Sequence, residues 1–174
     1  MRSSAVLLVA LMGAAVTVEA QVPSKEYLIG GFERQKGVML QYVDVMPDSA
    51  WHFAPTPGVR NYAQQLQHIA QATAGLTARL LAAPPTPPSL PPAERHLNDR
   101  QAMREFMAGS FDAAIAAVRA MTDADLRGDR QMFGMTRNGW QWVIGIQEHT
   151  AWTLGATVPY LRLNGVTPPT YLAF

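Results

Sequence analysis

The sequence predicts an all-α protein with the architecture of a four-helix bundle. Four segments carry apolar residues at three- and four-residue spacing, which is the helical period, and no segment shows sustained strand alternation. Two connections, a proline-rich one over 84–92 and a polar one over 122–137, are long enough to carry the chain along a bundle. The chain beyond residue 20 suits one domain with a sizeable core and leaves little room for a second.

The N-terminal segment predicts export. A short basic start, an apolar stretch over 5–18 and the small-residue pattern that ends at Ala20 form the three parts of a secretory signal. An uncleaved membrane anchor is the alternative, but the apolar stretch is shorter than the about 20 residues that a spanning helix needs. We therefore expect a signal peptide over 1–20 and a single domain over 21–174. The protein would be periplasmic or secreted, with no stable membrane anchor after cleavage.

Composition excludes several classes of function. The chain has no cysteine, so neither disulfide bonds nor a thiolate nucleophile or metal ligand is available. The formal net charge is +1 and the charges are scattered, which predicts no nucleic-acid binding. No Ser-His-Asp order, phosphate-binding glycine loop or paired-carboxylate spacing is present, and the sequence therefore leaves the catalytic residues unknown.

The first two helices have clear boundary signals. Ser24 is the expected cap of the first helix, which Pro47 ends, and Asn61 is the expected cap of the second. The apolar stripe of the first helix consists of Leu28, Phe32, Met39, Val43 and Met46. The core stripe of the second helix consists of Tyr62, Leu66, Ile69, Thr73, Leu76 and Leu80.

The last two helices follow the proline-rich segment. Six of the nine residues over 84–92 are proline, which forbids helix and favours an extended connection. The third helix is expected over 97–121, and the connection over 122–137 should contain about one helical turn. The last helix is expected over 138–164, closed by Gly165 in the left-handed conformation. Because this helix is apolar on nearly all sides, it should be the most buried element or should meet another subunit.

His149 marks a candidate pocket on the last helix. At 100° per residue, His149 shares an inward face of the helix with small and aromatic residues. The small residues leave space beside His149, and the aromatic residues would form the walls of that space. These expected lining residues are Trp142, Gly145, Ala156 and Tyr160, with Trp152 and Thr153 flanking them. Two interpretations stay open: a pocket for a small molecule, or a close approach of helices in which the aromatic residues fill core volume.

His68 lies at the edge of the apolar stripe of the second helix. A histidine in that position is either satisfied by a hydrogen bond or used as a metal ligand, and bundle interiors build metal sites from facing helices. Helical periodicity does not show that the second and last helices face each other. His52 and His96 precede helices and are expected to be solvated loop residues.

Two segments carry a resemblance to a known family. The residues over 57–72, PGVRNYAQQLQHIAQA, and those over 155–169, GATVPYLRLNGVTPP, are similar to the segments around the histidine ligands of the DinB-like (YfiT-like) family. In this family a closing "GQ…YLR…G…PP" pattern follows an H-x-x-x-H pair. Order and spacing agree over essentially the whole chain beyond the signal, although the middle matches only in length and helical character. The resemblance implies a four-helix bundle.

The resemblance also implies a metal site that is incomplete here. The family is expected to hold a divalent metal such as nickel or zinc with three histidines. Their positions fall on His68, His149 and Thr153, so the third histidine is replaced, and Ala156 stands where the family has glutamine. A catalytic zinc usually keeps three protein ligands. Glu148 is about 100° round the helix from His149 and should point elsewhere.

Three hypotheses of function follow. The first is an exported DinB-like protein with a degenerate or altered metal site that binds an unknown apolar or aromatic small molecule between Trp142, Trp152 and Tyr160. The alternative is a divalent-metal-dependent hydrolase or transferase that uses His68 and His149 as ligands for nickel or zinc. The third is an interaction protein that forms a homodimer through its last helix. No other cofactor is indicated.

Overall fold

The computed structural model describes residues 21–81 and 93–171. The predicted signal peptide over 1–20 and the proline-rich segment over 84–92 lie outside the described residues, so export and the extended connection stay predictions.

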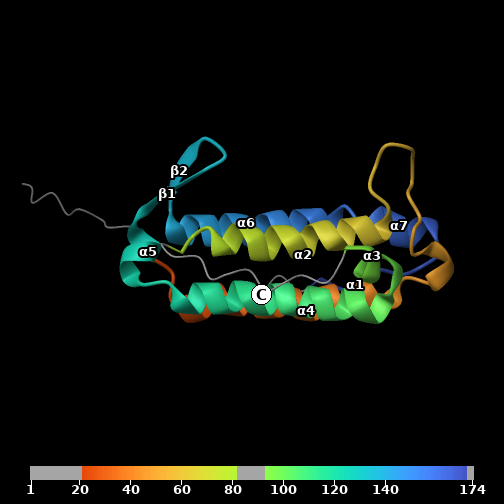
Figure 1. Ribbon diagram of the computed structural model, residues 1–174, viewed down its shortest axis with the longest axis horizontal. Helices are drawn as coiled ribbons and strands as arrows, with labels where there is room; N and C mark the ends of the chain where they lie inside the picture. The colour runs from red at the N-terminus through yellow and green to blue at the C-terminus, as the bar shows by residue number, and fades with distance from the viewer. Residues whose placement is uncertain (1–20, 82–92, 172–174) are drawn as a thin grey trace, which may run out of the picture.

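Four long helices form the bundle. They are α1 (Lys25–Val45), α2 (Tyr62–Ala78), α4 (Arg100–Ala120) and α6 (Gly139–Gly155). α1 and α2 each pack against both α4 and α6, which closes the four helices into a ring. Figure 1 shows α1 and α4 in one layer and α2 and α6 in the other. The predicted all-α four-helix bundle is confirmed.

The predicted helix caps are formed by the expected side chains. The hydroxyl of Ser24 accepts a hydrogen bond from the backbone N–H of Tyr27 at 3.1 Å. Asn61 and Gln64 exchange side-chain to backbone hydrogen bonds, both 2.9 Å long, in a capping box at the start of α2. Caps of this kind contribute about 1 kcal/mol each. α1 ends at Val45, shortly before Pro47, as predicted.

The third and last predicted helices are each divided. α3 (Ala93–Asn98) precedes α4, and the two are separated by Asp99, whose extended backbone and side chain cap α4. α6 is followed by α7 (Val158–Leu163), which carries a proline in its first turn. Pro159 has no N–H to continue the hydrogen bonding of α6, and its ring crowds the preceding turn. The expectation of single helices over 97–121 and 138–164 was therefore wrong.

The connection over 122–137 contains a β-hairpin that the sequence analysis missed. The one expected helical turn is α5 (Asp123–Arg127), and it leads into the antiparallel strands β1 (Asp129–Met132) and β2 (Met135–Asn138). Phe133 and Gly134 form the two-residue turn, with φ of 52° and 74°. Positive φ at both central residues is the geometry of a type I′ turn, which matches strand twist. The strands are too short and too polar to show alternation.

Large side chains fill the centre of the bundle, and a short helical turn closes one end. The buried rings of Phe32 in α1 and Phe111 in α4 meet edge to face, with 6.4 Å between centroids. The 3₁₀ turn η1 (Asp48–Ala50) places Trp51 beneath the guanidinium of Arg100, 4.7 Å from the ring centroid. No helix in the described part of the chain combines the length and apolarity needed to cross a membrane.

Candidate functional site

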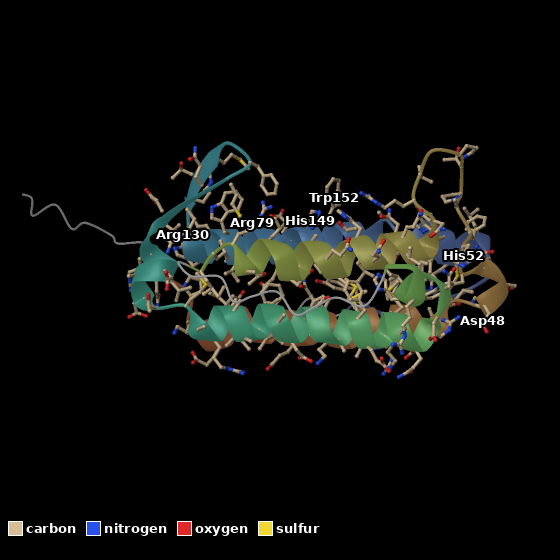
Figure 2. All side chains as sticks on the ribbon, in the orientation of Figure 1. Asp48, His52, Arg79, Arg130, His149 and Trp152 are labelled. Carbon is tan, nitrogen blue, oxygen red and sulfur yellow. The ribbon has the colours of Figure 1, made fainter. Side chains whose placement is uncertain are left out.

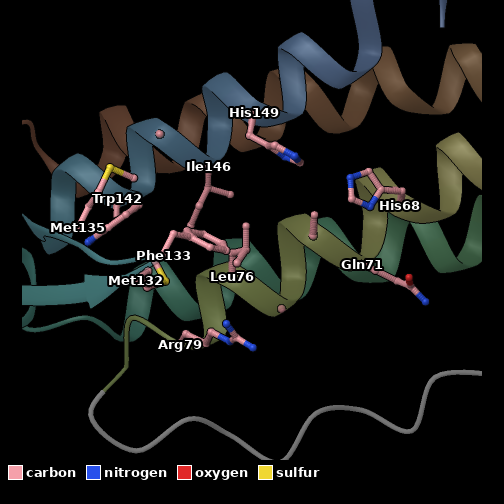
Figure 3. A pocket seen from close by; sticks show the side chains of 13 residues that line it. His68, Gln71, Leu76, Arg79, Met132, Phe133, Met135, Trp142, Ile146 and His149 are labelled. Carbon is pink, nitrogen blue, oxygen red and sulfur yellow. The ribbon is translucent and has the colours of Figure 1, made fainter. Parts of the chain in front are cut away.

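A cleft of about 720 Å³ opens between α2, α6 and the β1–β2 hairpin. Figure 2 shows Arg79, His149 and Trp152 on this side of the bundle, whereas Asp48 and His52 lie at the end remote from the hairpin. The cleft is shown from close by in Figure 3. The residues that line it are His68, Gln71, Ala72, Gly75, Leu76, Arg79, Met132, Phe133, Met135, Trp142, Gly145, Ile146 and His149.

The two helices present antiparallel stripes to the cleft. The α2 stripe runs from His68 to Arg79, which corresponds to roughly 16 Å at a rise of about 1.5 Å per residue. On α6, Trp142 lies at the hairpin end and His149 lies opposite His68. The cleft therefore has a histidine end and an aromatic end.

Glycines keep the middle of the cleft open. A Cβ atom added to Gly75 in α2 or to Gly145 in α6 would meet no atom within 4 Å. On the core side of the same helices, the buried hydroxyls of Thr73 and Thr150 are hydrogen-bonded at 2.9 Å. The helices thus stay in contact beneath the cleft, while the lack of a side chain at Gly75 and Gly145 leaves open volume above that contact.

The structure brings His68 and His149 together. Their ring centroids are 5.6 Å apart at an interplanar angle of 77°, and Figure 3 shows the two rings extending toward each other from α2 and α6. The Nδ1 atom of His149 is buried and has no hydrogen-bond partner among the described residues. Burial lowers the pKa of His68, and the charges of Arg60 and of His149 lower it further. The lowered pKa favours the neutral imidazole of His68, the form that binds a metal or accepts a hydrogen bond.

The donor set does not fit a three-histidine metal centre. Two imidazoles at this separation can reach one ion, since zinc–nitrogen bonds are about 2.0–2.1 Å long. Within the described ranges, however, no group of three or more histidine, cysteine, aspartate or glutamate side chains is positioned to hold a metal. Thr153 is buried and does not line the cleft. Glu148 lines a separate hollow against α1, which agrees with its expected direction away from His149.

The two remaining histidines differ from each other. His52 is exposed in the turn after η1, as predicted. His96 is buried, with its ring stacked on Phe106 at 4.2 Å between centroids and its Nε2 3.0 Å from the side-chain nitrogen of Gln67. The prediction of a solvated loop residue was therefore wrong for His96. The short helix α3 carries it inward, and a sequence pattern of six residues is too short to show that.

The hairpin supplies the aromatic end of the cleft. The indole N–H of Trp142 donates to the carbonyl of Arg130 in β1 at 2.8 Å. The ring of Phe133, at the hairpin tip, meets that of Trp142 edge to face at 6.3 Å. Met132 and Met135 flank this pair on the cleft side. The sequence did not lead us to predict that Phe133 lines the cleft. The feature that could have indicated a turn there is the Phe-Gly dipeptide between two short polar segments.

Of the six residues expected to line a pocket, Trp142 and Gly145 line this cleft. The other two aromatic residues do not. Trp152 is 77% exposed, and Tyr160 is buried beside Phe53 with its hydroxyl donating to the carbonyl of Arg60 at 2.8 Å. Around an ideal helix, Trp152 lies about 80° from Trp142. Its indole therefore points into solvent and not into the cleft.

The remaining two expected lining residues, Ala156 and Thr153, also lie outside the cleft. Ala156 is exposed at the end of α6, and Thr153 is buried, so neither forms part of its lining. α6 ends at Gly155, and the helical angles used for the prediction do not apply beyond that residue. The expected pocket therefore extends from His149 toward the hairpin instead of toward α7.

Comparison with known proteins identifies the family. A family model for the DinB superfamily matches residues 32–151. The chain belongs to the DinB superfamily. Its fold is similar to the crystal structure of a DinB-like protein from Bacillus subtilis, with 18% identity, a TM-score of 0.64, and coverage of 83% of this chain and 96% of that one. No match was found among curated proteins.

A second solved structure gives the same result. A DinB-like protein from Bacillus cereus is 16% identical, with a TM-score of 0.65 over 84% of this chain and 97% of the other. At this level of identity the two structures establish the fold alone. The cleft and its residues have to be interpreted from the present chain.

Proposed function

We propose that this DinB-superfamily member is an exported protein that binds an apolar or aromatic small molecule in the cleft between α2, α6 and the hairpin, and that its metal site is degenerate. The observation that carries the proposal is an open cleft of about 720 Å³ beside two histidines that no third metal-ligating side chain of the described residues joins. Small-molecule sites occupy about 300–1,000 Å³ and combine apolar walls with a few polar groups. Export rests on the sequence of residues 1–20.

The lining supports an apolar ligand. Leu76 and Ile146 face each other across the cleft, and Trp142 with Phe133 closes one end. The two histidines lie at the other end, where the buried Nδ1 of His149 lacks a partner among the described residues. A ligand with an apolar body and one polar group would complement the apolar walls and a polar side chain of this lining.

The test uses the neutral fluorescent probe N-phenyl-1-naphthylamine with the purified protein. We expect saturable binding that falls at least about 10-fold in Gly145→Leu, because the leucine side chain enters the open middle of the cleft. Gly109→Leu is the matched control, since Gly109 is an exposed glycine in α4 and a Cβ added there also meets no atom within 4 Å. Absence of saturable binding, or equal loss in both variants, would contradict the proposal.

Divalent-metal binding at His68 and His149 is the second candidate. The 5.6 Å separation of the rings and the unpartnered Nδ1 of His149 favour it. The protein is purified without a histidine tag, dialysed against nickel or zinc, and analysed for bound metal. Stoichiometric metal that is lost in His149→Ala but kept in His52→Ala would establish the metal site. Folded protein that retains no metal would support a degenerate site.

A further inference from the structure

The hairpin end of the cleft carries an unpartnered positive charge. Arg79 is the C-cap residue of α2, is exposed, and lines the cleft. It is the one permanently charged residue among the thirteen that line the cleft, and no carboxylate lies among them. The backbone N–H of Arg79 donates to the carbonyl of Thr77, but its guanidinium has no hydrogen-bond or ion-pair partner among the described residues. Its guanidinium is therefore available to a ligand.

A structural role for Arg79 has to be separated from ligand binding. A cation at the C-terminus of a helix interacts favourably with the helix dipole, and this would explain Arg79 without a ligand. That role predicts an effect of Arg79 on stability only. An effect on affinity that depends on the charge of a ligand would not follow from it.

Phe133 provides the second observation. Its φ of 52° is unfavourable for an L-residue with a Cβ, and asparagine or glycine suits this turn position better. The ring is 68% exposed and yet lies against Trp142 at the end of the cleft, so the turn gains little from burying it. An aromatic residue in this position has a clear use if the ring contacts a bound molecule.

We propose that the ligand is an aromatic monocarboxylate, whose ring packs against Phe133 and Trp142 and whose carboxylate binds the guanidinium of Arg79. This inference rests on the small-molecule binding proposed above and adds the ligand class and its orientation. Guanidinium and carboxylate groups form paired, charge-assisted hydrogen bonds, and the aromatic pair offers an edge and a face to a third ring. Figure 3 shows Arg79 near Leu76 and Phe133, at the end of the cleft remote from His68.

The experiment compares naphthalene-2-carboxylate with its neutral methyl ester by calorimetry at low salt. We expect the acid to bind about 5-fold more tightly than the ester, the size of an exposed ion pair, and the difference in affinity to shrink at high salt. Arg79→Met should reduce acid binding to the level of the ester. Arg119→Met is the matched control, because Arg119 is exposed on α4 and does not line the cleft.

Each outcome separates this inference from the proposed function. If acid and ester bind equally, or if Arg119→Met weakens acid binding as much as Arg79→Met, the carboxylate assignment is overturned while small-molecule binding stands. If neither the acid, the ester nor N-phenyl-1-naphthylamine binds, both proposals fail.

The Phe133→Asn variant tests the ring contact independently. It should retain or raise the melting temperature, because asparagine tolerates positive φ, and it should weaken binding of both naphthalene probes by about 5-fold or more. Unchanged affinity in a folded Phe133→Asn protein would overturn the assignment of Phe133 to the ligand site.

Discussion

The seam between α1 and α4 is closed by large side chains, whereas the seam between α2 and α6 is open toward solvent. Phe32 and Phe111 meet across the first seam and are fully buried. Gly75 and Gly145 occupy the second seam and leave space that no neighbouring side chain fills. The helices on both sides of each seam follow the same helical period. The size of the residues at facing positions therefore decides which seam has open space for a ligand.

Small residues alone do not produce a cleft. Gly37 in α1 and Gly109 in α4 have equally free surroundings, but both lie on exposed faces of their helices. Gly31 in α1 is covered by the side chain of Gln147, whose nearest atom would lie 2.5 Å from an added Cβ. A glycine contributes to a site only where it faces a second helix and nothing fills the space between them.

The largest expected effect concerns the closed seam. Phe111→Ala should reduce the free energy of unfolding by about 3–5 kcal/mol, because it removes a buried ring and leaves a cavity. Leu76→Ala in the open seam should cost about 1 kcal/mol, since this half-buried leucine already borders empty space. Urea denaturation of both variants measures the difference. Equal losses would mean that the two seams are equally well packed.

The next effect concerns the incomplete metal site. Thr153→His places a histidine one turn beyond His149 on α6 and supplies the third ligand that the resemblance to the family implies. We expect nickel and zinc affinity to rise at least about 10-fold over the parent protein, a gain abolished by adding His68→Ala. Calorimetric metal titration checks this. An unchanged affinity would show that the buried side chain at 153 does not reach the His68–His149 pair.

Replacing a glycine by alanine should change the free energy of unfolding by a smaller amount. The sign of that change should differ between the glycines that border the cleft and Gly31, which is covered by a side chain. Gly75→Ala and Gly145→Ala should each raise the free energy of unfolding by about 0.5–1 kcal/mol, because alanine favours helix and its methyl group enters free space. Gly31→Ala should lower it, because the methyl group displaces the side chain of Gln147. Thermal unfolding distinguishes these signs, and stabilisation in all three variants would contradict the packing at Gly31.

The smallest effect is a dependence of stability on pH at the histidine end. The pKa of His68 is lower in the folded protein than its ordinary value of about 6.5, so the unfolded chain binds more protons in the window between the two values. The free energy of unfolding should therefore fall as the pH decreases from about 6.5 through the folded pKa. His68→Gln should flatten this part of the profile, and His52→Gln, which leaves His68 in place, should not.

Much of the fold was predictable because local chemistry decides it. Ser24 and Asn61 cap their helices with their own side chains, and the periodic apolar residues fall on the buried faces. The division between α6 and α7 was also present in the sequence, since Pro159 cannot continue a helix. The hairpin was harder to predict, because its four-residue strands are supported by contacts with distant residues.

The site was only partly predictable. The proximity of His68 and His149 depends on which helices are neighbours, and this followed from the resemblance to the DinB-like family instead of from periodicity. The sequence did not single out Arg79, because cations are common at the C-terminus of a helix. Phe133 reaches the cleft only because the hairpin folds back on α6. The sequence shows the residue types of the site, but it does not show which distant residues lie close together in the fold.

Arg130 holds the base of the hairpin to α5, to α6 and to the residues just beyond α2. Its guanidinium is paired with Asp125 at 2.7 Å and donates to the carbonyl of Leu80 at 3.3 Å, while its own carbonyl accepts from Trp142. The anchor therefore belongs to β1, and the turn beyond it adds the contact of Phe133 with Trp142. We expect a change in the length or composition of that turn to alter one wall of the cleft more than the packing of the four helices. Under the proposed function, a few residues at the hairpin tip would set the ligand selectivity of the cleft, while the contacts of Arg130 keep the base of the hairpin in place.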